Sequence, residues 1–267
     1  MAAPASYLLS RRDAEHDRLR LQSRVWEPAG RALTADLDLP LGARVLDVGC
    51  GALGWLRVLA ERVPDGVVVG TDVDPDVLAI AGAACDRAGY DHVRLVEDDL
   101  FHSALPAGMF DLVHVRFQLA PLGRPADQLA AYRRLLKPGG ILVVEEPDSR
   151  TWTYEPYARA SASLIGRIAQ AVRGAGGDLD AGRRLARQLE HHLGGAPATR
   201  THVLGLEPGH PYPRLPLQLA ASLEPQLRDL LGADELDDLL AAAAAEIGDP
   251  GRAGTTFTLV QSWARVG

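Results

Sequence analysis

The chain has 267 residues, of which 47% are hydrophobic, so it can bury the core of one sizeable domain with an added segment. Its formal net charge of −7 argues against a nucleic-acid backbone or an anionic membrane as the main partner, and it favours small molecules. No apolar run is long enough to span a bilayer, the N-terminus lacks an apolar signal core, and the two cysteines give no disulfide framework. We therefore expect a protein of the reducing cytoplasm.

A charged amphipathic helix is expected first, over about residues 13–39. From residue 44 onward, short apolar runs alternate with helix-like segments, which predicts a parallel sheet with helices on both faces. The expected strands are residues 44–48, 67–71, 93–96, 110–115, 141–145, 199–206 and 255–266. The expected helices between them are residues 55–62, 75–88, 129–136, 158–173, 178–193, 215–231 and 234–247.

A glycine-rich turn follows the first expected strand, with Gly49, Gly51 and Gly54 in a G-x-G-x-x-G spacing. Glycines let the backbone approach a ligand closely, and the next helix offers unpaired N–H groups to an anionic group. This spacing alone also fits a dinucleotide such as NAD. Asp47 stands two residues before the turn, and its carboxylate would repel a pyrophosphate but attract an ammonium group. The charge therefore favours a cationic ligand over NAD.

The string VLDVGCG at this turn resembles the first motif of class I S-adenosylmethionine (SAM) dependent methyltransferases. Downstream, TDVDPDVL, FDLVHVRF and RRLLKPGGILVVEEPD resemble later motifs of the same family, in the expected order. The resemblance extends over residues 44–148, with weaker similarity at both ends. It implies an α/β fold with a doubly wound, seven-stranded, mostly parallel Rossmann-like sheet, order 3-2-1-4-5-7-6, with an antiparallel final strand, N-terminal helices and a helical cap.

The resemblance also implies a cofactor site at the strand ends. Asp47 would face the methionine end of SAM, Asp72 would accept the ribose hydroxyls, and Asp99 would accept a hydrogen bond from the adenine amino group. The acidic run at residues 97–99 could instead suggest a divalent metal, but adjacent side chains on an extended chain point in different directions, so no metal is expected. The complete set of expected cofactor-binding residues is Tyr7, Asp47, Gly49, Gly51, Asp72, Val73, Asp99, Leu100 and Arg116.

Several of these residues have an alternative interpretation. Tyr7, and more weakly Gln22, would close over the SAM carboxylate, but the leading helix could simply pack on the core. Val73 would pack on the adenine, and the backbone N–H of Leu100 would recognise the adenine ring. Asp74 followed by proline is a helix-start signal, which is the structural explanation for this acidic cluster.

The fourth strand is expected to end over the methyl group and the acceptor, with Arg116, Phe117 and Gln118 at its end. Relatives with a similar motif often carry a histidine where this chain has Pro121, so a mechanism that uses that histidine is excluded. His114 lies within the strand, which is more typical of a hydrogen-bonded core histidine than of a base. The catalytic base therefore stays unknown, the other candidates being His16, His202, His210 and the tyrosines near residue 154.

We expect three parts in the chain: residues 1–41 as an N-terminal helical lid, 42–150 as the SAM-binding core, and 151–267 as the remaining core strands with a helical substrate cap. Aromatic residues at 152, 154 and 157 could wall a substrate pocket or pack a helix onto the sheet. Glu146 to Asp148, at the end of strand five, could face substrate or cap the next segment. The helices between the last two strands would exclude water from the reacting centre.

The predicted function is methyl transfer from SAM to an O, N, C or S atom of a small-molecule metabolite, with S-adenosylhomocysteine as product. In-line displacement would rely mainly on proximity and desolvation. By family analogy we expect a role in natural-product biosynthesis, with no nucleic-acid or membrane partner. A homodimer is possible. A SAM-binding protein without transferase activity is the alternative, because Leu53 stands where a third glycine is common and could narrow the space beside the methionine chain. A nicotinamide-dependent oxidoreductase is a weaker alternative.

Overall fold

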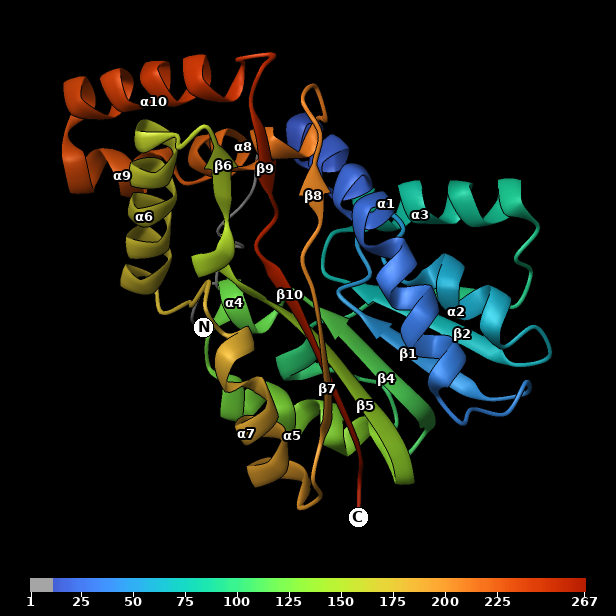
Figure 1. Cartoon of the computed structure of the whole chain (residues 1–267). Helices are drawn as coiled ribbons and strands as arrows, with labels where there is room; N and C mark the ends of the chain where they lie inside the picture. The colour runs from blue at the N-terminus through green and yellow to red at the C-terminus, as the bar shows by residue number, and fades with distance from the viewer. Residues whose placement is uncertain (1–11) are drawn as a thin grey trace.

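The computed structural model describes residues 12–267, with side chains from residue 18 onward. Its centre is a seven-stranded sheet in the order β3-β2-β1-β4-β5-β10-β7 (Figure 1). Its strands are β1 (Arg44–Val48), β2 (Val67–Asp72), β3 (Val93–Glu97), β4 (Phe110–Arg116), β5 (Leu136–Asp148), β7 (Ala198–His202) and β10 (Thr258–Arg265). β10 runs antiparallel to β5 and β7, and the other pairs are parallel. The predicted doubly wound sheet, its order and its antiparallel final strand are confirmed.

Helices cover both faces of the sheet because successive strand residues point to opposite sides. Val45 and Leu112 join the apolar cluster beneath α1, α2 and α3, whereas Leu46 and Val113 join the cluster beneath α5 and α7. These helices are α1 (Arg12–Asp36), α2 (Leu56–Arg62), α3 (Pro75–Ala88), α5 (Pro125–Leu135) and α7 (Gly182–Leu193). None of the described helices combines the length and the apolar character needed to cross a membrane.

The last two predicted strands each divide between two sheets, so their prediction as continuous strands was wrong. The first gives β7 and β8 (Gly205–Leu206), and the second gives β9 (Ala253–Thr255) and β10. β9 lies between β6 (Thr153–Glu155) and β8 and pairs with both in a separate three-stranded sheet. At the break Thr256 and Leu204 exchange hydrogen bonds, and the side chain of Phe257 joins the core of the cap.

The cap consists of α6 (Arg159–Gly174), α8 (Leu215–Ser222), α9 (Glu224–Leu231) and α10 (Ala233–Ile247), which stand together beyond one end of the main sheet (Figure 1). The single helix expected over residues 215–231 divides at Leu223, because Pro225 can start a helix but cannot donate within one. Glu246 of α10 accepts the N–H groups of Ala160 and Ser161 at 3.0 and 2.8 Å, which joins α10 to the start of α6.

β5 begins before its predicted start. The segment from Lys137 to Gly140 was expected to turn the chain after the helix, but it lies within β5. The pairing of β5 with β4 is irregular there, between Phe110 and Leu112, and Gly139 has a φ of 75°. The Pro-Gly-Gly signal therefore marks an irregularity inside a strand.

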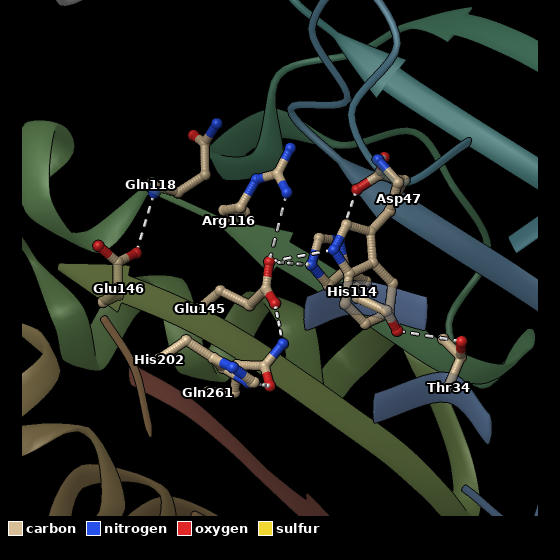
Figure 2. A network of polar contacts seen from close by, with 11 residues as sticks. Thr34, Asp47, His114, Arg116, Gln118, Glu145, Glu146, His202 and Gln261 are labelled. Carbon is tan, nitrogen blue, oxygen red and sulfur yellow. Dashed lines mark hydrogen bonds and ion pairs between the residues drawn. The ribbon is translucent and has the colours of Figure 1, made fainter. Parts of the chain in front are cut away.

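A row of buried polar side chains crosses the middle of the main sheet (Figure 2). Asp47 Oδ1 of β1 lies 2.7 Å from His114 Nδ1 of β4, and His114 Nε2 lies 3.3 Å from Glu145 Oε2 of β5. Gln261 of β10 donates to Glu145 and pairs through its carbonyl oxygen with His202 Nε2 of β7 at 2.9 Å. Five adjacent strands thus contribute one polar side chain each, and the first four are at most 2% exposed.

His114, the second member of this row, is a hydrogen-bonded core histidine. Trp55 stacks on its ring at 3.8 Å between centroids and donates Nε1–H to Glu145 Oε2 at 3.0 Å. Burial opposes the charged form, but the neighbouring carboxylates Asp47 and Glu145 raise the pKa of His114. Burial likewise opposes ionisation of Glu145, yet the hydrogen bond from His114 lowers the pKa of that carboxyl. The imidazolium therefore stabilises both buried carboxylates, and Arg116, 3.7 Å from Glu145 Oε2, adds a second positive charge beside Glu145.

Replacing His114 by glutamine should destabilise the protein most at mildly acidic pH. A group whose pKa is raised by folding gives stability that is fully present below its unfolded pKa, about 6.5 for histidine, and lost as the pH rises through its folded pKa. Breaking a buried charge pair costs about 3 kcal/mol. Urea unfolding should therefore reveal a deficit of this size in His114→Gln at pH 6 and a smaller deficit at pH 9.

His202→Gln is the matched control, because His202 belongs to the same row but is only half-buried at the edge strand. It should cost no more than about 1 kcal/mol at either pH. A deficit in His114→Gln that stays constant or grows between pH 6 and pH 9 would contradict a charged His114.

Candidate functional site

The carboxyl ends of the parallel strands open into a cavity of about 980 Å³. Ligands of open α/β sheets bind at this edge. The glycine turn and the ends of β2 and β3 line one half of the cavity, which is polar, and the cap lines the other half, which is apolar. The volume lies at the upper end of the range for small-molecule sites, so two ligands have room side by side.

The glycine turn forms the floor of the polar half. Gly49 and Gly51 have φ values of 61° and 60°, and an added Cβ at Gly49 would lie 2.0 Å from Nε2 of Gln118. Gly54 is equally constrained, because a Cβ there would lie 2.7 Å from Asp47 Oδ2. Leu53 is not among the residues that line the cavity. Leu53 therefore does not narrow the space above the turn, as the sequence had suggested it could.

Asp47 lines the cavity, but both of its oxygens already have partners. Oδ1 pairs with His114, and Oδ2 accepts the N–H of Trp55 at 2.8 Å. The residue is 2% exposed. Asp47 thus holds the head of α2 and the middle of the sheet together while it presents negative charge beneath the turn.

Asp72 lies at the end of β2, where the turn and α3 converge on it. Its Oδ2 accepts the N–H of Gly51 at 3.0 Å, and its Oδ1 accepts the N–H of Asp74 at 3.1 Å. Burial raises the pKa of Asp72 above its ordinary value, and these two N–H groups oppose the rise. Beside it the side chain of Val73 is 56% exposed and lines the cavity.

The two aspartates that follow β3 bond to separate partners. Asp98 accepts the N–H of Ala104, and Asp99 accepts the N–H of Phe101 at 3.0 Å and lies 2.8 Å from His102 Nδ1. The hydrogen bond with His102 lowers the pKa of Asp99. Leu100 follows on the cavity wall. Asp99 therefore caps a short 3₁₀ turn at the place where the adenine interaction was expected.

A further buried carboxylate, Glu146, organises the loop after β4, a role that the sequence did not identify. It accepts three backbone N–H groups, from Gln118, Leu119 and Ala120 at 2.7 to 3.0 Å. Burial raises the pKa of Glu146 to about 8, against these three donors. We expected it to face substrate or to cap the segment that follows it. It caps α4 (Leu119–Leu122), which precedes it in sequence.

Phe117, next to that helix, has a φ of 57°, which is unusual for a residue other than glycine. Its ring packs edge-on against Phe257 at 5.6 Å. Both rings belong to the apolar half of the cavity. The apolar side chains that line this half include Phe117, Trp152, Ile168, Val172, Leu179, Leu215, Leu219, Leu223 and Phe257.

The three aromatic residues after β5 have three different placements. Trp152 lines the cavity. Tyr154 packs inside the cap and donates to the carbonyl of Pro213 at 2.9 Å. Tyr157 is 68% exposed. Trp152 therefore forms part of the pocket wall, which is one of the two roles expected for this aromatic cluster.

The candidate bases do not converge on the apolar half of the cavity. His114 borders the cavity but is held between two carboxylates, and His202 and His210 are not among the lining residues. Gln22 of α1 does line the cavity, and it accepts a hydrogen bond from Arg18 at 2.7 Å. Tyr7 and the side chain of His16 lie outside the part of the chain that the structure describes.

Comparisons with known proteins agree with this architecture. A family model described as a methyltransferase domain matches residues 45–140. Nocamycin O-methyltransferase of Saccharothrix syringae is 36% identical over 186 residues, 67% of this chain and 63% of the relative. Demethylmenaquinone methyltransferase of Anoxybacillus flavithermus is 30% identical over 138 residues, 49% of this chain and 58% of the relative. The chain thus spans less than two thirds of the length of either relative.

Among solved structures, geranyl diphosphate C-methyltransferase from Streptomyces coelicolor A3(2), in complex with S-adenosyl-L-homocysteine, shares the fold at a TM-score of 0.52 and 15% identity. That match covers 97% of this chain and 90% of the other. The domain match, the relatives and the strand order together show that the chain belongs to the class I S-adenosylmethionine-dependent methyltransferase family.

Proposed function

We propose that the protein transfers the methyl group of SAM to an O, N, C or S atom of a small, largely apolar metabolite and releases S-adenosylhomocysteine. The observation that carries the proposal is the cavity, which joins the glycine turn and Asp72 to an apolar chamber under the cap. The names of the relatives, which mention nocamycin and demethylmenaquinone, support a small-molecule acceptor. Both ligands would share one enclosed space.

The polar half offers hydrogen-bond acceptors and negative charge that suit SAM. Gly49 and Gly51 leave room for the methionine chain above Asp47, whose charge attracts its ammonium group. Asp72 keeps acceptor capacity on both oxygens for the ribose hydroxyls, since each oxygen accepts one N–H group. We assign the adenine to the wall formed by Val73 and Leu100, with Asp99 at its edge.

The chain itself would contribute alignment and exclusion of water. When bound, SAM supplies a methyl group already activated by its sulfonium. The acceptor would lie among the apolar side chains of the cap, with Phe117 and Trp152 fixing its plane. Such positioning replaces a bimolecular encounter by a near-attack geometry, which can supply much of the acceleration. A dedicated base is required only for a weakly acidic acceptor.

Incubation of the purified protein with methyl-labelled SAM and a panel of apolar phenols, amines and carboxylic acids tests this function. Mass spectrometry should detect S-adenosylhomocysteine and a labelled product in equal amounts. Tight SAM binding without labelled product across the panel would favour a SAM-binding protein that does not transfer methyl. Binding of a nicotinamide cofactor in place of SAM would overturn the proposal.

Replacing Asp72 by asparagine should weaken SAM binding by about tenfold or more. The loss of charge removes one acceptor from a pair of charge-assisted hydrogen bonds to the ribose. Asp76→Asn is the matched control, because Asp76 is exposed on α3 and does not line the cavity. Isothermal titration calorimetry measures both dissociation constants, and equal affinities in the two variants would contradict the ribose assignment.

Replacing Gly49 by alanine should abolish or severely weaken SAM binding. The new Cβ would displace Gln118 into the space assigned to the methionine chain. Gly89→Ala isolates the effect of backbone strain, because Gly89 also has a positive φ, 72°, but has no neighbouring atom within 4 Å of an added Cβ. Calorimetry should find wild-type affinity in Gly89→Ala and at least tenfold weaker binding in Gly49→Ala, whereas equal affinities would exclude a close approach at Gly49.

A further inference from the structure

Arg116, at the end of β4, is a buried cation with one unpaired hydrogen-bond donor. Its side chain is only 8% exposed, and its Nη1 has no hydrogen-bond partner among the residues that the structure describes. Glu145 Oε2 lies 3.7 Å from that nitrogen, which is an ion-pair distance but too long for a hydrogen bond. Buried donors of this kind normally have a partner, so the unmet one indicates a ligand group.

The surroundings of Arg116 belong to the acceptor half of the cavity. Its Cζ lies 5.7 Å from the ring centroid of Phe117, which packs on Phe257. Arg116 is also close enough to Tyr212, beneath the cap, to oppose the burial that raises the pKa of that hydroxyl. Figure 2 shows Arg116 at the strand end above Glu145, between Gln118 and Asp47. The guanidinium therefore stands where the polar half of the cavity meets the apolar chamber.

The local charges leave this junction ready for an anion. Arg116 and a protonated His114 together offset the charges of Asp47 and Glu145. SAM adds a sulfonium, so an anionic acceptor would neutralise the loaded site. Among the described residues, the carboxylates and histidines that line the cavity all lie on β1 and β4 or at and just after the ends of β2 and β3, and the cap contributes no base that could deprotonate an acceptor. An acceptor that is already ionised at neutral pH needs no such base.

We propose that Arg116 selects an apolar acceptor that carries a delocalised oxyanion, either a carboxylate or an acidic enolate of a 1,3-dicarbonyl. This deepens the proposed function and rests on it. A guanidinium donor would hold one oxygen of the anion. A lone pair on the other oxygen would form the new bond to the methyl carbon, and the electron pair of the breaking carbon–sulfur bond would return to sulfur.

Both products of this step are neutral: a methyl ester or enol ether, and S-adenosylhomocysteine. No proton, metal or further reactant is required. Because an anion and a cation disappear together, a site that excludes water favours the reaction. The neutral product no longer pairs with Arg116, which assists its release. The sequence resemblance had instead put Arg116 among the cofactor-binding residues.

Calorimetry on two ligands separates these roles. With S-adenosylhomocysteine bound, the wild-type protein should bind 2-naphthoic acid or anthraquinone-2-carboxylic acid at least tenfold more tightly than the corresponding carboxamides. The acidic enol 4-hydroxycoumarin distinguishes the enolate from the carboxylate. In Arg116→Gln the preference for the acid should fall about 10- to 100-fold while SAM affinity changes less than threefold. Arg116→Lys should retain part of the preference, because it keeps the charge.

Arg200→Gln is the matched control, since Arg200 pairs with Asp36 at the edge strand and does not line the cavity. Thermal unfolding of each variant checks the fold. An intact acid preference in Arg116→Gln, or no acid binding by the wild-type protein in the presence of S-adenosylhomocysteine, would overturn the assignment. Loss of SAM affinity alone would return Arg116 to the cofactor. Absence of SAM binding by the wild-type protein would instead refute the proposed function itself.

Discussion

The contact between His114 and its two carboxylates is the constraint on which the rest of the site depends. Asp47 lies beneath the glycine turn and is 2% exposed, so a buried carboxylate at this position requires a neighbouring cation. His114 supplies that charge from the adjacent strand and shares it with Glu145. Because Asp47 also accepts the N–H of Trp55, the same carboxylate fixes the first turn of α2. The geometry of the turn is therefore set from inside the sheet.

A second carboxylate performs the equivalent task on the acceptor side. Glu146 gathers three N–H groups of the loop after β4, and this fixes the chain where Phe117 takes its unusual conformation. Neighbouring residues of β5 thus support the two halves of the cavity: Glu145 belongs to the polar row under the glycine turn, and Glu146 holds the wall of the apolar half. A shift of β5 by one residue would exchange their faces and disrupt both halves.

The sequence predicted the sheet well because strand length, helix caps and glycine turns are local signals. Asp74 caps α3 as expected, and β1 has its predicted bounds. The division of the last two strands was missed because apolar alternation does not reveal which sheet a strand joins. Thr256 and Phe257 decide it through contacts with residues far away in sequence.

The candidate site was predictable to the same extent. The residues at the turn and the strand ends do line one cavity, as their positions after parallel strands suggested. The pairing of Asp47 with His114 and the three partners of Glu146 could not be foreseen, since these residues lie 67 and 26 to 28 positions away and depend on register. The role proposed for Arg116 likewise depends on its unpaired Nη1, which only the folded chain reveals.

A crystal structure of the protein with S-adenosylhomocysteine bound tests the central claim most directly. The predicted result is electron density for the ribose on Asp72, for the adenine beside Val73 and Leu100, and for the sulfur facing the apolar chamber next to Arg116. Density for the ligand outside this cavity, or with its sulfur turned away from the chamber, would contradict a methyltransferase site built on these residues.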